Sequence, residues 1–316
     1  MVLSEGIDSF ERIIQKRYYH VDKTIMIKEI LYHHKKDVIL ITRPRRFGKS
    51  LNLSMLECFL NIERKDEGTT LFGGLRIMDD KEVCEQWMHR YPVIHVSFKD
   101  VVGCMENDNS SRVDSAVSRL KGVIGDIALK HRFLLRSDHL NEDDMIAYKQ
   151  ISTLSTSASG TRFDMGYDAL VNGLKTLSSL LQKHYGMPVV MLIDEYDTPL
   201  NEASRLGYYD EFVNTYMSLL RVALEGNDAL ALAVLTGCLK LSVFTDLNNL
   251  QVYDVTDQGL DDCYGFKDEE VSAMLDYFGL SQYHEPVKRF YSGYRFASQL
   301  VYNPWDVIVS LTSFYL

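Results

Sequence analysis

The residues best suited to chemistry lie in the string Arg-Pro-Arg-Arg-Phe-Gly-Lys-Ser at positions 43–50. A phosphate-binding loop needs backbone N–H groups curled around an anion and a helix N-terminus behind them. It also needs a lysine for the outer phosphates and a hydroxyl for Mg²⁺. Gly48, Lys49 and Ser50 supply these parts in the required order. We therefore predict that positions 43–50 form a P-loop that binds ATP, with Ser50 as a magnesium ligand.

Two features of this P-loop are unusual. Arg43 stands where such loops normally have glycine, so the start of the loop must bend differently or carry strain. Arg43, Arg45, Arg46 and Lys49 also gather four of the 34 Lys and Arg residues into one loop, which we expect to face phosphate. The competing interpretation is a basic surface turn of an acidic protein. The residues expected to bind the nucleotide are Arg45, Arg46, Phe47, Gly48, Lys49, Ser50 and Leu51.

A second chemical signal is the acidic pair Asp194 and Glu195, directly after the apolar run 189–193. Ligands of open α/β sheets bind beyond the carboxyl ends of the strands. In P-loop NTPases an acid at this place holds Mg²⁺. We expect Asp194 to hold the metal with Ser50, and Glu195 to orient or deprotonate the attacking water. A strand that merely ends in an acidic loop would look the same, but together with Lys49 the pair favours an ATPase.

A third signal is Thr236, at the end of another apolar run. A hydroxyl there could hydrogen-bond the γ-phosphate or the water, and we count Thr236 with Lys49 and Glu195 as catalytic candidates. A turn residue that satisfies its own backbone is an equally good interpretation.

The elements that must position these residues follow from the hydrophobic pattern. Short apolar runs predict strands at 37–41, 92–98, 188–193 and 230–235, and helix-like stretches lie between them, including 24–34 and 49–60. This alternation predicts an α/β fold with a mostly parallel sheet. We expect the Ser/Thr-rich stretch 152–161 to be a surface loop. After position 253 the chain reads as charged and aromatic helices without a strand, so we predict a P-loop domain at 1–253 and a helical C-terminal region at 254–316.

Composition limits the class of protein. Hydrophobic residues at 46% and charged residues at 25% are ordinary for a globular chain and exclude low-complexity disorder or a disulfide-stapled miniprotein. The 34 basic and 44 acidic residues give a net charge of −10, which argues against a surface that coats nucleic acid. The five cysteines form no C-x-x-C pair, so we expect reduced thiols. We see no signal peptide or membrane span, and expect a cytoplasmic protein.

Several strings in this order resemble the bacterial AAA-ATPase-like family. They are Tyr-His-Val-Asp-Lys-Thr at 19–24, the loop at 43–51, Leu-Ile-Asp-Glu-Tyr-Asp-Thr-Pro-Leu at 192–200, Leu-Thr-Gly at 235–237, Phe244 with Leu-Asn-Asn-Leu at 247–250, Tyr-Ser-Gly-Tyr-Arg-Phe at 291–296 and Tyr-Asn-Pro-Trp at 302–305. Arg43 departs from the general P-loop but not from this family.

The resemblance implies an additional-strand, AAA-like P-loop core, with Lys49 and Ser50 on phosphate and magnesium, Asp194 and Glu195 as the acidic pair, and residues 21–24 beside the base. Many family members continue into a restriction-endonuclease-like nuclease domain, which we expect to be absent from these 316 residues.

Taken together, these signals predict an ATP-binding protein in which Mg²⁺-dependent hydrolysis drives a conformational switch. Two alternatives stay open. One is a non-hydrolysing, nucleotide-gated interaction module of a defence or nucleic-acid-processing complex. The other is a P-loop small-molecule kinase, which Glu195 disfavours because a kinase must avoid activating water. The nucleotide is the expected partner, a homo-oligomer and nucleic acid through a separate nuclease domain are left open, and no membrane partner is expected.

Overall fold

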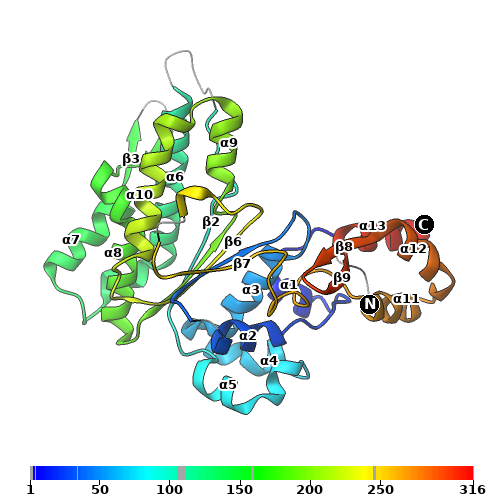
Figure 1. Ribbon diagram of the computed structural model, residues 1–316. Helices are drawn as coiled ribbons and strands as arrows, with labels where there is room; N and C mark the ends of the chain where they lie inside the picture. The colour runs from blue at the N-terminus through cyan, green and yellow to red at the C-terminus, as the bar shows by residue number, and fades with distance from the viewer. Residues whose placement is uncertain are drawn as a thin grey trace. The chain divides into compact units, whose positions relative to one another are not determined.

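A five-stranded sheet organises the chain in a computed structural model, which describes residues 3, 5–33, 35–104, 111–157, 160–244 and 247–315 (Figure 1). Its strands lie in the order β2-β5-β6-β1-β7, and β2, β5 and β6 run parallel. The bounds are β1 Val38–Thr42, β2 Val93–Ser97, β5 Val189–Asp194, β6 Leu230–Gly237 and β7 Leu250–Tyr253. The mostly parallel sheet with flanking helices confirms the predicted α/β fold, and β6 is the additional strand between β1 and β5.

The long strands follow directly from their sequences. Every residue of β1 and of β5 is buried, as expected for strands covered on both faces. The bounds of the four predicted strands agree with those of β1, β2, β5 and β6 to within two residues at each end. The prediction missed β7, whose four residues are all only partly buried.

Contacts along the chain define two compact units. One comprises Met1–Lys35, Leu40–Arg90 and Gln251–Leu316, and the other Lys36–Ile39 and Tyr91–Leu250. β1 thus contributes residues to both units. The domain boundary expected at position 253 stays a prediction.

The first unit contains the helix that follows the P-loop and the whole C-terminal region. Its elements are α1 Phe10–Gln15, α2 Ile25–His33, α3 Lys49–Leu60, η1 Ile62–Glu67, α4 Gly68–Phe72, η2 Arg76–Asp79, α5 Lys81–Trp87, α11 Asp268–Tyr277, η5 Ser281–Tyr283, α12 His284–Tyr291, β8 Ser292–Phe296, β9 Gln299–Tyr302 and α13 Pro304–Tyr315. The antiparallel pair β8–β9 corrects the prediction that the C-terminal region has no strand. We call β8 and β9 the C-terminal hairpin.

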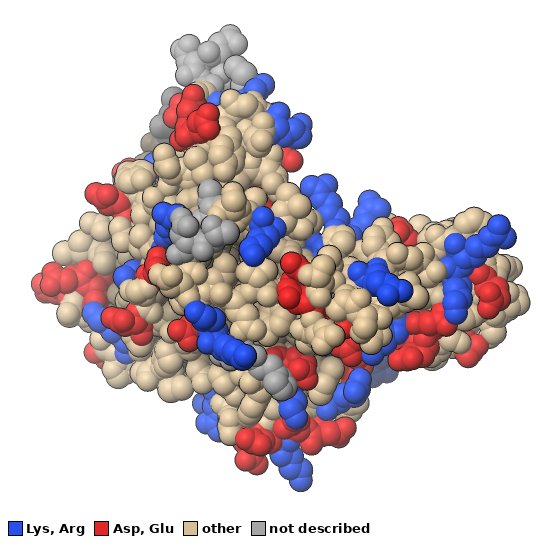
Figure 2. All heavy atoms as spheres, in the orientation of Figure 1, with Lys and Arg blue, Asp and Glu red and all other residues tan. Residues whose placement is uncertain are grey.

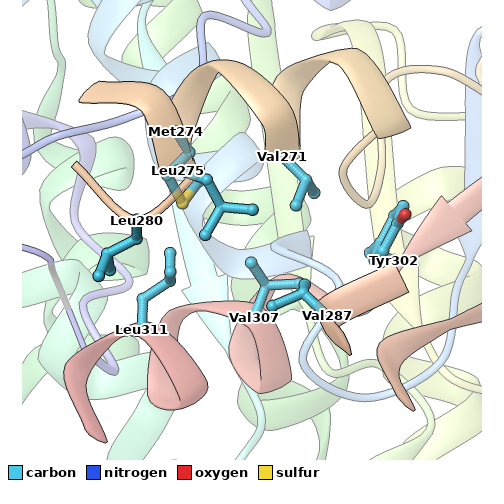
Figure 3. Close-up of a cluster of buried hydrophobic side chains, with 8 residues drawn as sticks. All are labelled: Val271, Met274, Leu275, Leu280, Val287, Tyr302, Val307 and Leu311. Carbon is cyan, nitrogen blue, oxygen red and sulfur yellow. The ribbon is translucent and has the colours of Figure 1, made fainter. Parts of the chain in front are cut away.

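The C-terminal region has a hydrophobic core of its own. In Figure 3 its side chains converge between α11 and α13, and they are Val271, Met274, Leu275, Leu280, Val287, Tyr302, Val307 and Leu311. Leu3, Tyr19 and Val21 from the start of the chain pack against this cluster. Because both ends of the sequence contribute to it, the C-terminal region is held in the first unit by buried apolar surface.

The second unit packs helices on its part of the sheet. Its elements besides β2, β5 and β6 are α6 Arg112–Lys130, η3 Arg132–Arg136, α7 Glu142–Ser152, β3 Leu154–Ser157, β4 Gly160–Phe163, α8 Tyr167–Tyr185, α9 Thr198–Leu206, α10 Tyr209–Leu224 and η4 Ser242–Phe244. β3 and β4 form an antiparallel hairpin. In the stretch 152–161, predicted as a surface loop, most of the described residues are thus exposed but in strands, and residues 158 and 159 lie outside the described residues.

Charged side chains of both signs are interspersed over the face drawn in Figure 2. This distribution is typical of a solvated surface and differs from the continuous basic stripe of a nucleic-acid-coating protein. Among the described residues, no helix combines the length and the apolar character that a membrane crossing requires.

Candidate functional site

The P-loop connects the end of β1 to the start of α3 in the first unit. The backbone takes the left-handed conformation at Arg46, with φ of 71°, and at Gly48, with φ of 80°. Glycine adopts this conformation without strain, whereas Arg46 carries a cost of about 1–2 kcal/mol. The sharp bends therefore lie late in the loop and not at position 43, which explains why that position tolerates a residue other than glycine.

Lys49 is the first residue of α3, and the residue is only 4% exposed. Its ammonium donates to the carbonyl oxygens of Arg43 at 3.2 Å and of Pro44 at 3.1 Å. The loop thus curls around its own lysine. Ser50 and Leu51 follow in the first turn of the helix, half-buried, where backbone N–H groups lack partners within the helix and suit an anion.

Arg43 does not face phosphate, and the expectation that it does is wrong. Its side chain is fully buried. The guanidinium donates to the carbonyls of Thr42 and Tyr253, both at 2.9 Å, and to that of Leu260 at 3.2 Å. Burial lowers the pKa of Arg43 from its usual value, but an arginine keeps its charge in proteins. The sequence did not reveal this because the carbonyl of Leu260 lies 217 residues away.

The other P-loop side chains divide between solvent and core. Arg45 is exposed, in keeping with a role toward a charged ligand. Arg46 is also exposed, and its guanidinium lies 5.0 Å from the ring centre of Trp305. Phe47 is buried, so only its backbone remains to meet a nucleotide.

In the second unit, the predicted acid and the predicted hydroxyl are in direct contact. Asp194 ends β5 and is 5% exposed, and Thr236 on the neighbouring strand β6 is fully buried. The hydroxyl of Thr236 donates to Oδ1 of Asp194 at 2.5 Å. The alternative that Thr236 satisfies its own backbone is therefore wrong.

Glu195 follows with an unusual backbone. Its φ is 54°, a left-handed conformation that a residue with a side chain adopts at a cost. Its Oε2 accepts a hydrogen bond from the hydroxyl of Thr198 at 2.9 Å. The two carboxyl groups of the acidic pair therefore differ in environment, since Asp194 is buried and Glu195 is half-buried.

Two further residues of this turn were not assigned a role from the sequence. Asp197 is 1% exposed, and its Oδ2 accepts from the backbone N–H groups of Cys238 at 3.1 Å and Leu239 at 3.0 Å. The hydroxyl of Tyr196 donates to the carbonyl of Leu239 at 2.6 Å and accepts from the N–H of Leu241. These bonds join the turn after β5 to the segment after β6. In the sequence, the only indication of these two residues was their place in the string Asp-Glu-Tyr-Asp at 194–197.

Gly237 is required where these two segments meet. A Cβ at this position would lie 2.5 Å from Oδ1 of Asp197 and 2.7 Å from the ring of Tyr196. Any larger residue would push the strand end away, so the glycine after Thr236 permits the close approach of the two loops.

The string at 19–24 ties the first unit together. Oδ1 of Asp22 accepts from the N–H and hydroxyl of Thr24, and Oδ2 accepts from the N–H of Arg76 at 2.8 Å. The ammonium of Lys23 contacts Glu270 at 2.7 Å. The placement of this segment beside a base stays a prediction.

The sequence matches the family described as "Predicted AAA-ATPase" over residues 4–246. The chain belongs to this AAA-ATPase-like family. Membership indicates nucleotide binding and agrees with the P-loop and the sheet order. The chain is also 26% identical over 312 residues to a protein described as "Uncharacterized protein in vnfD 5'region", from Azotobacter chroococcum mcd 1. The match covers 96% of this chain and 50% of that relative, so the chain spans half of its length. No solved structure gives a significant match.

Proposed function

We propose that this AAA-ATPase-like protein binds Mg²⁺-ATP at the P-loop and hydrolyses it, and that the nucleotide state drives a conformational switch. Binding is supported by the left-handed bends at Arg46 and Gly48, which turn the loop around the ammonium of Lys49. On binding, this ammonium would exchange the loop carbonyls for phosphate oxygens, and the exposed Arg45 would add charge.

The donor set suits magnesium. A serine hydroxyl and a carboxylate are the hard oxygen ligands that Mg²⁺ prefers beside phosphate, and we assign these roles to Ser50 and Asp194. The metal would supply neutralisation of charge that develops on the phosphates. Thr236 positions the Asp194 carboxylate through the 2.5 Å hydrogen bond.

The observation that carries hydrolysis, beyond binding alone, is the backbone of Glu195. A left-handed residue costs about 1–2 kcal/mol, and such cost is typically retained where it serves a site. The strained turn places half-buried Glu195 next to buried Asp194 in the chain, and we assign the orientation of water to Glu195. Because the proton of the Thr236 hydroxyl is committed to Asp194, Thr236 would accept from the water rather than donate to the γ-phosphate.

Phosphate release from ATP tests this proposal, with and without DNA. We expect Glu195→Gln to keep ATP binding and to lose turnover by about 10²–10⁴-fold, whereas Lys49→Ala loses both. The matched controls are Glu211→Gln and Lys65→Ala, which replace exposed residues of the same types and should retain wild-type rates.

Two results would contradict the proposal. Binding without turnover in the wild type would remove hydrolysis and favour the nucleotide-gated interaction module. Turnover that survives Lys49→Ala would refute the site. Stimulation by DNA would support the nucleic-acid partner that the resemblance left open.

A further inference from the structure

The C-terminal hairpin packs against the P-loop. The buried Phe47 ring contacts two rings of β8. Its centre lies 4.9 Å from that of Tyr294, in an edge-on arrangement, and 5.0 Å from that of Phe296. Phe47 therefore connects the two elements: its backbone is part of the P-loop, and its side chain packs against the C-terminal hairpin.

Arg43 makes a second connection to the same region. Its guanidinium carbon lies 5.1 Å from the ring centre of Phe296 and 5.3 Å from that of Tyr264. The carbonyl of Leu260 accepts one of its N–H groups. The residue that replaces the usual glycine of a P-loop thus fixes the loop to segments more than 200 positions later in the chain.

Two more contacts show that this packing is close and extends into α3. A Cβ at Gly265 would lie 3.2 Å from the Phe47 ring and 3.0 Å from Val301, and its φ of 82° also favours glycine. The side-chain amide of Asn52, in the first turn after the loop, donates to the carbonyl of Cys263 at 3.1 Å. Loop, helix start and C-terminal region therefore cannot shift independently without loss of buried contacts.

We infer that Phe47 and Arg43 are positioning residues through which the C-terminal hairpin sets the shape of the P-loop and, with it, the affinity for ATP. This inference rests on the proposed function. Energetic linkage is reciprocal. If the hairpin favours the binding shape of the loop, then bound ATP must stabilise the hairpin by the same factor. The C-terminal region would then be the element that reports nucleotide occupancy.

The decisive variants lie in the hairpin, outside the nucleotide machinery. Tyr294→Ala removes the ring that faces Phe47, and Tyr294→Phe keeps it. Leu300→Ala, on the paired strand β9, is the matched control because Leu300 is, like Tyr294, an exposed apolar residue of the hairpin. ATP affinity is measured by titration with a fluorescent ATP analogue. Protection of residues 292–302 is measured by hydrogen exchange with and without ATP. The same titration and hydrogen-exchange measurements are made on Arg43→Lys.

We expect Tyr294→Ala to raise the Kd for ATP by about threefold to tenfold, the equivalent of an aromatic pair, while Tyr294→Phe and Leu300→Ala keep wild-type affinity. In the wild type, ATP should slow exchange in 292–302, and Arg43→Lys should lose that protection. A purely structural role would lower stability without this ATP-dependent signal.

Four results would overturn the inference. An unchanged Kd in Tyr294→Ala, or an equal rise in Leu300→Ala, would refute the coupling and leave the proposed function intact. The coupling would also be refuted if ATP slowed hydrogen exchange in the P-loop but not in residues 292–302. A wild type that does not bind ATP would overturn the proposed function and this inference with it. If Arg43→Lys fails to fold, the comparison at Tyr294 and Leu300 still decides.

Discussion

Asp197 offers the sharpest test of how the second unit is held together. Its Oδ2 accepts three N–H groups, those of Cys238 and Leu239 on the backbone and that of Asn201 on a side chain at 3.1 Å. Its Oδ1 is buried and has no hydrogen-bond partner among the described residues. Asp197→Asn keeps the shape and one acceptor oxygen but removes the charge, so it isolates the electrostatic part of the contact.

The expected loss can be worked from this geometry. A hydrogen bond to a charged group contributes about 1.5–3 kcal/mol and a neutral one about 0.5–1.5 kcal/mol, so each of the three bonds to Oδ2 loses about 1 kcal/mol. The new amide NH₂ takes the place of Oδ1, which is buried without a partner among the described residues, and an NH₂ group that stays unpaired there costs about 1–3 kcal/mol. Removal of a buried charge offsets part of this. We expect a net destabilisation of about 2–3 kcal/mol.

Urea denaturation followed by circular dichroism measures this loss as a shift of the midpoint at constant slope. Asp210→Asn is the matched control, because Asp210 is exposed on the same unit, and it should stay within about 0.5 kcal/mol of the wild type. We also expect slower ATP hydrolysis in Asp197→Asn, since the released segment begins two residues after Thr236. A stability change no larger than that of Asp210→Asn would refute the argument that the charge holds the two loops together.

Three further outcomes are expected. Gly125→Ala should destabilise the second unit by about 1–3 kcal/mol in urea denaturation, because a Cβ there would lie 2.2 Å from the ring of Phe163. A thiol reagent should modify the exposed Cys104 rapidly and Cys58 only on unfolding, because burial raises the pKa of Cys58 to about 12. A tyrosine hydroxyl and a lysine lower the pKa of Asp268 by hydrogen bonding. The stability that this carboxylate contributes is therefore present above the unfolded pKa of about 3.9 and is lost as pH falls below it, and acid titration of Asp268→Asn should show a shallower loss.

The sequence predicted the parts of the fold that hydrophobic pattern alone determines. Continuous apolar runs marked the buried strands, and the helix expected at 49–60 has the same bounds as α3. The short hairpins were missed because their stability depends on pairing rather than on burial. In β8 three of five residues are exposed, and four-residue β3 is Ser/Thr-rich. Such segments carry no alternation strong enough to distinguish them from loops.

The site was predicted in its residues but not in its connections. The spacing around Lys49 identified the P-loop, and the acids after an apolar run identified the end of β5. What the spacing could not supply was the direction of each side chain. Arg43 and Arg45 are identical in type and two positions apart, yet one is buried among carbonyls and rings and the other is exposed. The partners that decide this lie in the C-terminal region, beyond the reach of any local pattern.

The way Arg43 and Lys49 are buried bears on how an acidic protein can bind phosphate. The hydrogen bonds of both cations to the loop and to Leu260 are accepted by backbone carbonyls. A carbonyl satisfies an N–H group through its dipole but does not cancel a full charge, as a carboxylate would. Carbonyl dipoles therefore satisfy most of the N–H groups that these two cations bring into the loop, although Nε of Arg43 is buried without a hydrogen-bond partner among the described residues. In a chain with a net charge of −10, a loop whose cations are held by carbonyl dipoles is a favourable place for a polyanion.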